Sequence, residues 1–449
     1  MGLRATALLS ILGVGLVLAV LLATHEWGFG WHPDGAPHYR FLLEDVSDRY
    51  VYQMRGRWLP SGRTPYLQEE SEYPQLATWL FAAPYLFFTS AGPVGRAQTA
   101  REFNEARADS ARYFDLHHVS MAISLLALLL LTALGLRELG HAPGWALLLF
   151  LPGTVYFSFN RFDAWPASFV ALALLLQFRG RRLGAAAALA LGAMMKWYPI
   201  LLLPLFLSHN LHGRPERADA GGEAPRPGPQ RSLLARLPGA VLLPGVVAAL
   251  LCVAILGVTY CWDHGGMAAV TWVYKKQGFR PPNPPSLVWA LAGPGRWGWV
   301  PEAAMDRLTG ALQWLQFLPG FALALLPVRS RRSLLWGSLV VVLAFAQFGK
   351  VFSPQWVVWV APIAVLLAPV STASLLFNVV LQVLIYVQIP VLWYATMRSG
   401  PADLEPGAGA GAFWAVCDAR IVLLFLFWAW SLGAFLRTVL RGRQPESAP

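Results

Sequence analysis

Long apolar runs are the feature that most limits how this chain can fold. Stretches such as Met121–Leu134, Leu334–Gly349 and Ile421–Leu436 contain no charged residue. Such runs are typical of membrane helices, because a helix satisfies its own backbone hydrogen bonds inside a bilayer. They exclude a disordered chain, a small disulfide-rich scaffold and a peripheral protein with one anchor.

Composition supports the same class of protein. Hydrophobic residues make up 56% of the 449 residues and charged residues only 13%, whereas soluble chains have about 25% charged residues. We therefore expect an all-α integral membrane protein, a polytopic helical bundle with about 10–13 membrane segments. The three cysteines, Cys252, Cys261 and Cys417, have no metal-ligand spacing and allow at most one disulfide.

The distribution of arginine and lysine predicts an orientation. The net charge is +11, but the basic residues collect in short segments between apolar runs, where the positive-inside rule places cytoplasmic loops. Three such segments fall on one side of the predicted bundle: 214–236, 329–332 and 437–443. The outer side then receives 263–306, 349–355 and 396–412. The basic charge is thus explained by the membrane, and no nucleic-acid partner is expected.

The apolar stretch 183–208 breaks the alternation of sides. Basic residues at Arg179–Arg182 and in 214–236 flank it at both ends. The stretch is therefore expected to form a hairpin, with two short arms that meet at Met195–Pro199 partway through the membrane. Non-helical backbone at that depth is tolerated only inside protein or beside a cavity.

The amino-terminal part is expected to place a polar loop outside. Met1–Ala23 is interpreted as a retained helix with Arg4 inside, since it exceeds the ~7–15 residues of a signal-peptide core. Within the following loop, Leu42–Trp58 is typical of an amphipathic helix lying on the membrane. Its apolar face would carry Val46, Tyr50, Met54 and Trp58.

The domain organisation follows from these loops. We expect an amino-terminal membrane module at 1–208, with an outer catalytic loop at 25–74 and the hairpin at 183–208. A flexible basic cytoplasmic loop at 209–237 precedes a carboxyl-terminal membrane module at 238–436. That module contains an outer loop at 261–310, and a cytoplasmic tail follows at 437–449.

Searches for soluble catalytic motifs give little. Gly293–Gly298 matches the GxGxxG pattern, but no strand precedes it, so a dinucleotide site is not expected. The chain has no Walker A, HExxH or GxSxG sequence and no Asp-x-Asp pair that would hold a metal against a sugar nucleotide. A cytoplasmic nucleotide-dependent catalytic domain is therefore not expected.

Several outer segments resemble a known family. Asp48-Arg-Tyr-Val-Tyr52, Gly62-Arg-Thr-Pro65-Tyr66 and Tyr73-Pro74-Gln-Leu76-Ala77 resemble the first-loop signature of GT-C glycosyltransferases, in particular the polyprenol-phosphate-mannose-dependent alpha-mannosyltransferases. Asp163 through Arg182 to Lys196-Trp-Tyr-Pro199 is similar to that group's aspartate, basic turn and Lys-x-x-Pro hairpin. Phe352-Ser-Pro-Gln-Trp-Val-Val-Trp359 is similar to its Ser-Pro-Gln-aromatic element. The matches span about residues 42–360. One departure is Gln75, where the family commonly has a second proline.

The resemblance implies a GT-C-like bundle with its active site on the extracytoplasmic face. Asp48 occupies the position of the family's first-loop catalytic aspartate, and the resemblance implies that it is the general base. Asp45 and Asp163 are the other catalytic candidates.

Elementary chemistry agrees with this activity. Nucleotide sugars are made in the cytoplasm, so transfer at the outer face needs a donor that the membrane carries, and a polyprenyl-phosphate sugar meets that need. An inverting transfer requires a carboxylate to accept the acceptor's proton and cations to stabilise the departing phosphate. Candidate substrate-binding residues are Tyr52, Arg161, Lys196, His264, Lys350 and Gln355. No cofactor is required; a divalent metal would suit the chemistry, but no residue pattern indicates one.

Some of these residues have a second interpretation. Asp163 precedes an apolar run and would suit an N-cap, or it would pair with Arg161. Lys350 would suit a snorkelling anchor, and a lone loop histidine such as His264 usually has no specific role. If Lys196 and Lys350 only hold the donor phosphate, Lys→Met at either position should change stability little.

The sequence thus predicts a hexosyltransferase of the bacterial cytoplasmic membrane, with mannose favoured and a lipid or glycan as acceptor. Its partners would be membrane lipid, the lipid-linked donor and the acceptor. Two alternatives remain: a transporter or flippase of lipid-linked glycans, and a polysaccharide polymerase or ligase.

Overall fold

The computed structural model describes residues 1–24, 46–88, 100–213, 232–263, 265–293, 296–393 and 410–441, and within these ranges the chain is helical with no strand. The amino-terminal half has the helices α1 (Leu3–Thr24), α2 (Val46–Gly56), α3 (Trp58–Ser61), α4 (Gln75–Ala82), α5 (Ala100–Glu138), α6 (Pro152–Asn160), α7 (Ala164–Phe178), α8 (Arg182–Met195) and α9 (Leu203–His212). The other half has α10 (Leu233–Leu237), α11 (Leu243–Trp262), α12 (Met267–Phe279), α13 (Leu287–Ala292), α14 (Met305–Ala322), α15 (Arg331–Phe348), α16 (Val357–Leu367), α17 (Thr372–Tyr386) and α19 (Ala410–Arg441).

Short 3-10 and π turns join several of these helices. They include η3 (Ala83–Leu86), η5 (Pro143–Phe150), η6 (Tyr198–Leu202), η7 (Pro238–Leu242), η8 (Glu302–Ala304), η9 (Leu323–Leu325), η10 (Pro354–Trp356), η11 (Ala368–Val370) and η12 (Val387–Trp393). Most of them contain a proline, which removes a backbone donor and favours such local changes of helix geometry.

Seven helical spans within the described ranges are long and apolar enough to cross a membrane. They are Leu3–Ala23, Ala108–Glu138, Leu233–Trp262, Glu302–Leu325, Arg331–Phe348, Thr372–Trp393 and Gly411–Arg441. The prediction of an all-helical multi-pass membrane protein is therefore confirmed, while the total of about 10–13 segments and their sidedness stay predictions. Three shorter apolar stretches are also present: Ala164–Phe178, Arg182–Met195 and Pro354–Val370.

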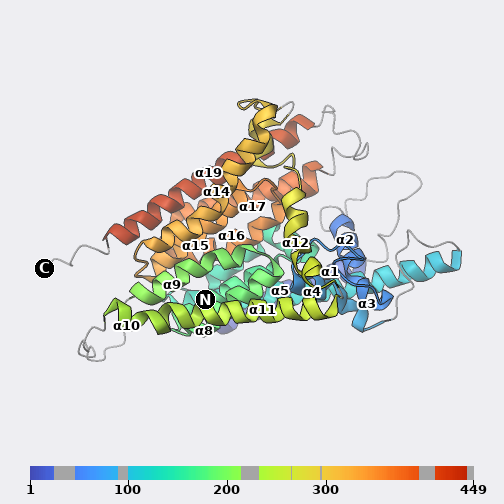
Figure 1. Cartoon of the computed structure of the whole chain (residues 1–449), viewed down its shortest axis with the longest axis horizontal. Helices are drawn as coiled ribbons and strands as arrows, with labels where there is room; N and C mark the ends of the chain where they lie inside the picture. Colours follow the sequence, from blue (N-terminus) through green and yellow to red (C-terminus); the bar gives the residue numbers. More distant parts are fainter. Residues whose placement is uncertain are drawn as a thin grey trace.

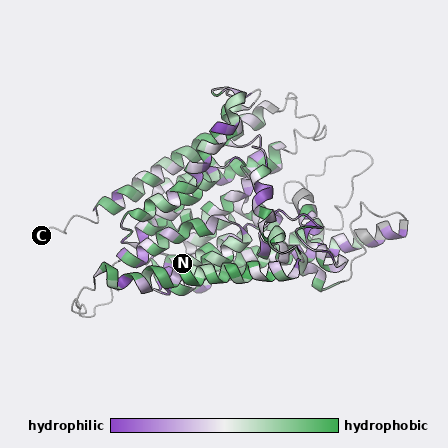
Figure 2. Cartoon of the chain, viewed as in Figure 1, coloured by the Kyte–Doolittle hydropathy of each residue, from purple (hydrophilic) through white to green (hydrophobic). Residues whose placement is uncertain are grey.

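The core lies around α7, α15 and α16. Every residue of α16 is buried, and so are most residues of α7 and α15. By contrast, α11 buries only four of its residues, and Figure 2 shows it apolar along its whole length. A helix that is apolar on all sides and enclosed by protein is central, whereas an exposed apolar surface suits contact with lipid.

The two ends of the bundle differ (Figure 1). The small helices α2, α3, α4 and α12 gather at one end, while α10 and the carboxyl end of α19 lie at the other. Helix α2 contacts α4, α5 and α6. Described parts of the expected outer loops, in α2, α3 and α12, are thus drawn at the other end from α10 and the end of α19, which are expected to be cytoplasmic (Figure 1).

The predicted amphipathic helix over 42–58 differs from the observed one. Helix α2 ends at Gly56 and α3 starts at Trp58, and residues 42–45 lie outside the described ranges. The polar side of α2 is also buried: Arg49 bonds to His118 at 2.7 Å, and Gln53 donates to Ser110 at 2.9 Å. The helix therefore packs into protein on both its apolar and its polar side.

Candidate functional site

Three distant segments meet around the carboxyl group of Asp163. This residue directly precedes α7, Lys196 directly follows α8, and Trp359 lies in the first turn of α16. Oδ1 of Asp163 accepts a hydrogen bond from the Lys196 ammonium at 2.7 Å and another from the indole N–H of Trp359 at 2.7 Å. Asp163 is fully buried, with 0% of its surface exposed.

The Asp163 carboxylate is not a helix cap. Its side chain makes no capping hydrogen bond to α7, so the N-cap interpretation is wrong. The other interpretation, an ion pair between Asp163 and Arg161, is also not observed. Asp163 forms its ion pair with Lys196 instead. The second oxygen, Oδ2, is buried and has no hydrogen-bond partner among the described residues. Since a buried polar atom usually has a partner, Oδ2 keeps an unused capacity to accept a hydrogen bond.

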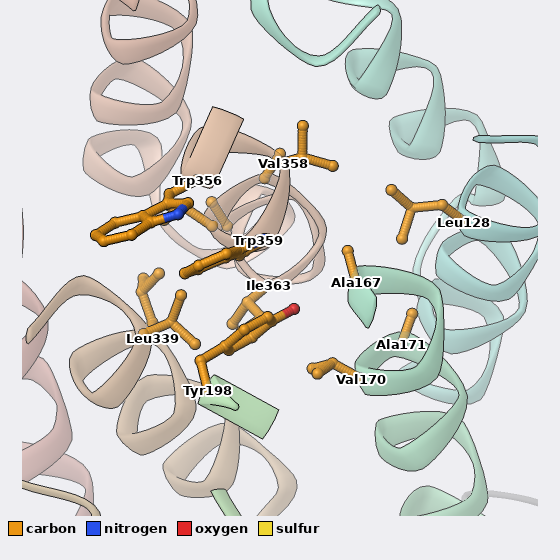
Figure 3. Packing of buried hydrophobic residues seen from close by; sticks show 14 of the residues in the cluster. Leu128, Ala167, Val170, Ala171, Tyr198, Leu339, Trp356, Val358, Trp359 and Ile363 are labelled. Atoms are coloured by element: carbon orange, nitrogen blue, oxygen red, sulfur yellow. The ribbon is translucent and has the colours of Figure 1, made fainter. Parts of the chain in front are cut away.

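A stack of aromatic rings forms one wall of this site (Figure 3). Trp359 lies between Trp356 and Tyr198, with ring centroids 4.9 Å and 4.2 Å away and nearly parallel planes. The Lys196 ammonium lies 4.7 Å from the ring centroid of Phe162 and 5.2 Å from that of Trp359. These faces attract a cation and keep the ammonium in place beside Asp163.

The local sequence explains why Lys196 is presented here. Helix α8 ends at Met195, and Lys196 has extended backbone geometry with φ −158°. Pro199 then lies in the first turn of η6, a position where its missing backbone N–H costs no helical hydrogen bond, so the chain starts a new helical turn directly after the extended Lys196. The break falls within the predicted apex at 195–199.

Helix α2 reaches the same cluster through Tyr52. The Tyr52 ring stacks on Phe81 at 4.5 Å and meets Phe162 edge-on at 5.7 Å. Asp48 precedes Tyr52 by four residues, one helical turn, but its side chain lies outside the part that the structure describes. Asp45 and His264 also lie outside the described residues.

The remaining predicted site residues divide into two groups. Arg161 and Gln355 are buried close in sequence to Asp163 and Trp359, with 7% and 8% of their surfaces exposed. Lys350 is elsewhere: its ammonium donates to the carbonyl oxygen of Gly278 at 2.7 Å. Burial, and then the charge of Arg280, lower the pKa of Lys350 from its usual value.

The two predicted outer loops contact each other. Lys276 of α12 donates to the carbonyl oxygen of Glu70 at 2.9 Å, and the backbone N–H of Tyr66 donates to the Asp263 carboxylate at 2.9 Å. Tyr66 is fully buried, and that burial raises its pKa. The loop at 261–310 therefore supports the first loop instead of standing apart from it.

Sequence reasoning missed several structural residues near the site. Arg420 is fully buried in α19, where it donates to Gln388 and to the carbonyl oxygen of Pro285, and its guanidinium lies 3.5 Å from the Phe352 ring centroid. Asn283 bonds to both the N–H and the carbonyl of Phe352, at 2.8 Å and 2.7 Å. The signal for Arg420 is a charge directly before an apolar run, where ionisable groups are costly.

The site offers a carboxylate, a cation and aromatic surfaces within one buried cluster. A carboxylate can accept a hydroxyl proton, a lysine can stabilise a phosphate, and stacked rings can hold a sugar or a lipid. Across the described ranges, no three His, Cys, Asp or Glu side chains lie close enough to hold a metal ion.

Comparisons with known proteins add no family to this picture. No protein-family model matches the chain, and a search of curated proteins finds no match.

Proposed function

We propose that this protein is a GT-C-like integral membrane glycosyltransferase. It transfers a hexose, with mannose favoured, from a polyprenyl phosphate to a lipid or glycan acceptor at the extracytoplasmic face of a bacterial cytoplasmic membrane. The reaction inverts the anomeric centre. The protein works as a multi-pass enzyme that takes its donor from the membrane.

One observation carries this proposal. Asp163, the Lys196–Pro199 segment and the Phe352–Trp359 segment are far apart in sequence, and each carries part of the family resemblance. They meet at the Asp163 carboxylate, where Lys196 and Trp359 both bond to Oδ1 at 2.7 Å. A chance similarity in three unrelated segments would not require them to share one buried cluster.

The chemistry assigns a role to each group. Asp48 is the general base, Asp45 its neighbour in the first loop, and Asp163 accepts a hydrogen bond from a substrate hydroxyl through Oδ2. Lys196 and Arg161 stabilise the charge that grows on the departing phosphate. Tyr52 and Gln355 line the donor site, and His264 contacts the acceptor.

Lys350 has a different place in this proposal. Its ammonium contacts the backbone carbonyl of Gly278, near the end of α12, so it binds substrate at the loop surface rather than beside Asp163.

The test is transfer without a gradient. Purified protein in detergent is mixed with labelled polyprenyl-phosphate mannose and a total lipid extract as acceptor, and release of polyprenyl phosphate is measured. The proposed enzyme consumes the donor and forms a labelled product. A transporter would leave the donor intact in detergent and move lipid-linked glycan only in sealed vesicles, and that pattern would overturn the proposal.

A further inference from the structure

A groove lies at the end of the bundle opposite the candidate site. It has a volume of about 420 Å³ and runs between the start of α8 and the turn η7 that leads into α11. This volume is within the range of ~300–1,000 Å³ typical of ligand sites. It is lined by Gly180, Arg181, Arg182, Leu183, Gly184, Gly239 and Leu243.

The described lining of this groove carries positive charge from two arginines. Arg181 and Arg182 are exposed, and neither forms an ion pair with any residue that the structure describes. The nearby carboxylate of Glu138 already pairs with Arg179 at 2.8 Å. Two guanidinium groups at the edge of a groove are suited to a phosphate, which they can hold with several hydrogen bonds.

The surface that continues from the groove is apolar. Leu243, Val246, Leu250 and Val253 lie three or four residues apart on α11, and between 50% and 62% of each residue is exposed. Residues at this spacing share one face of a helix. This apolar stripe starts at the groove and would accommodate hydrocarbon chains, which a soluble phosphate does not have.

We propose that this groove binds the headgroup of an anionic phospholipid. Arg181 and Arg182 hold the phosphate, and the acyl chains follow the apolar stripe of α11. Basic pockets between membrane helices recognise acidic lipids by this combination of charge and apolar surface. The site is independent of the proposed sugar transfer.

Native mass spectrometry of the full-length protein tests the site. The protein in mixed micelles is titrated with phosphatidylglycerol or phosphatidylcholine, and the first bound lipid is quantified. We expect phosphatidylglycerol to bind more tightly, and the variant R181Q/R182Q to lose about fivefold in affinity for each arginine removed. Phosphatidylcholine binding should not change.

A second variant fills the groove without changing its charge. A Cβ added at Gly239 meets no atom within 4 Å, so Gly239→Leu should fold and exclude the lipid. The matched control is Gly245→Leu, which also meets no atom within 4 Å but lies about 200° around α11 from Leu243. The charge control is R437Q/R441Q at the end of α19.

Three results would overturn the proposal. One is an unchanged lipid preference in R181Q/R182Q or in Gly239→Leu. Another is an equal loss in R437Q/R441Q or Gly245→Leu, which would mean that the attraction is diffuse. The third is full competition by glycerol 3-phosphate at the lipid's own concentration, which would assign the groove to a soluble anion.

Discussion

Asp163 and Lys196 form an ion pair in which the carboxylate is fully buried and the lysine side chain keeps 19% of its surface exposed. Removing one partner of a buried ion pair leaves an uncompensated charge and typically costs about 3–5 kcal/mol. The sequence led us to expect that Lys196→Met would change stability little. We now expect it to lower stability, because the ammonium bonds to a carboxylate with 0% exposure.

A double-mutant cycle separates stability from activity at this pair. We expect Lys196→Met to lower the free energy of unfolding by about 3–5 kcal/mol, because it leaves a fully buried carboxylate unpaired. Asp163→Asn should cost less, because the lysine side chain keeps 19% of its surface exposed to water. The double variant should recover most of that loss, because no charge remains unpaired, yet it should stay inactive. Denaturant unfolding in detergent and the transfer assay measure the two effects. Losses that simply add in the double variant would mean that the two side chains do not interact.

Asp48 is predicted to matter for the reaction and not for the fold. Asp48→Asn keeps the shape of the side chain and removes its basicity, so turnover should fall by about 10²–10⁴-fold while the unfolding midpoint stays within error. Asp45→Asn is the comparison variant in the same loop, because Asp45 is the alternative catalytic candidate. Near wild-type turnover in Asp48→Asn, together with a large loss in Asp45→Asn, would move the base to Asp45.

At the scale of elements, the close approach of α2 to α4 positions Tyr52 against Phe81. Gly56 ends α2, and a Cβ built there would lie 2.1 Å from the backbone carbonyl oxygen of Phe81. Gly56→Ala should therefore push the two helices apart and cost about 1–3 kcal/mol, with a loss of transfer because the Tyr52–Phe81 stack lies one turn away. The readouts are thermal unfolding and the transfer rate.

Gly15→Ala provides the control for that substitution. An added Cβ at Gly15 meets no atom within 4 Å, and alanine favours a helix over glycine by about 1 kcal/mol. This variant should keep or slightly raise stability. Equal stability of Gly56→Ala and Gly15→Ala would show that α2 is not held tightly against α4.

The sequence predicts elements better than it predicts contacts. Charge and periodicity locate the apolar helices and the break after Met195, because both are local properties of the chain. The bond between Trp359 and Asp163 joins residues that are 196 positions apart, and no local pattern specifies it. Burial of Arg49 likewise depends on His118 in α5, which hydropathy alone cannot reveal.

At the scale of the whole molecule, the orientation in the membrane decides which reaction is feasible. Basic segments at 329–332 and at the end of α19 favour one end of the bundle as cytoplasmic. Phe162, next to Asp163, contacts Tyr52 of α2 and Phe81 of α4, and these two helices lie at the opposite end (Figure 1). A donor that is carried by the membrane is required only if that end faces outward.

Cysteine accessibility tests this orientation directly. In a background lacking Cys252, Cys261 and Cys417, we expect a cysteine at Gly222 to react with an impermeant maleimide only after the cytoplasmic side is opened. A cysteine at Gly293 should react in intact cells. A Cβ there would lie 2.5 Å from the carbonyl oxygen of Trp289, so this substitution shifts the local backbone and a second outer position is needed.

Pro281→Cys provides an independent outer position for the same experiment. Pro281 is exposed in the segment that follows α12, and a proline has no backbone N–H whose hydrogen bond the substitution could break. The cysteine at 281 should therefore react in intact cells without disturbing the fold. Labelling of 222 and 281 from the same side would reverse the orientation argument, and the reasoning for a polyprenyl-phosphate donor would fail with it.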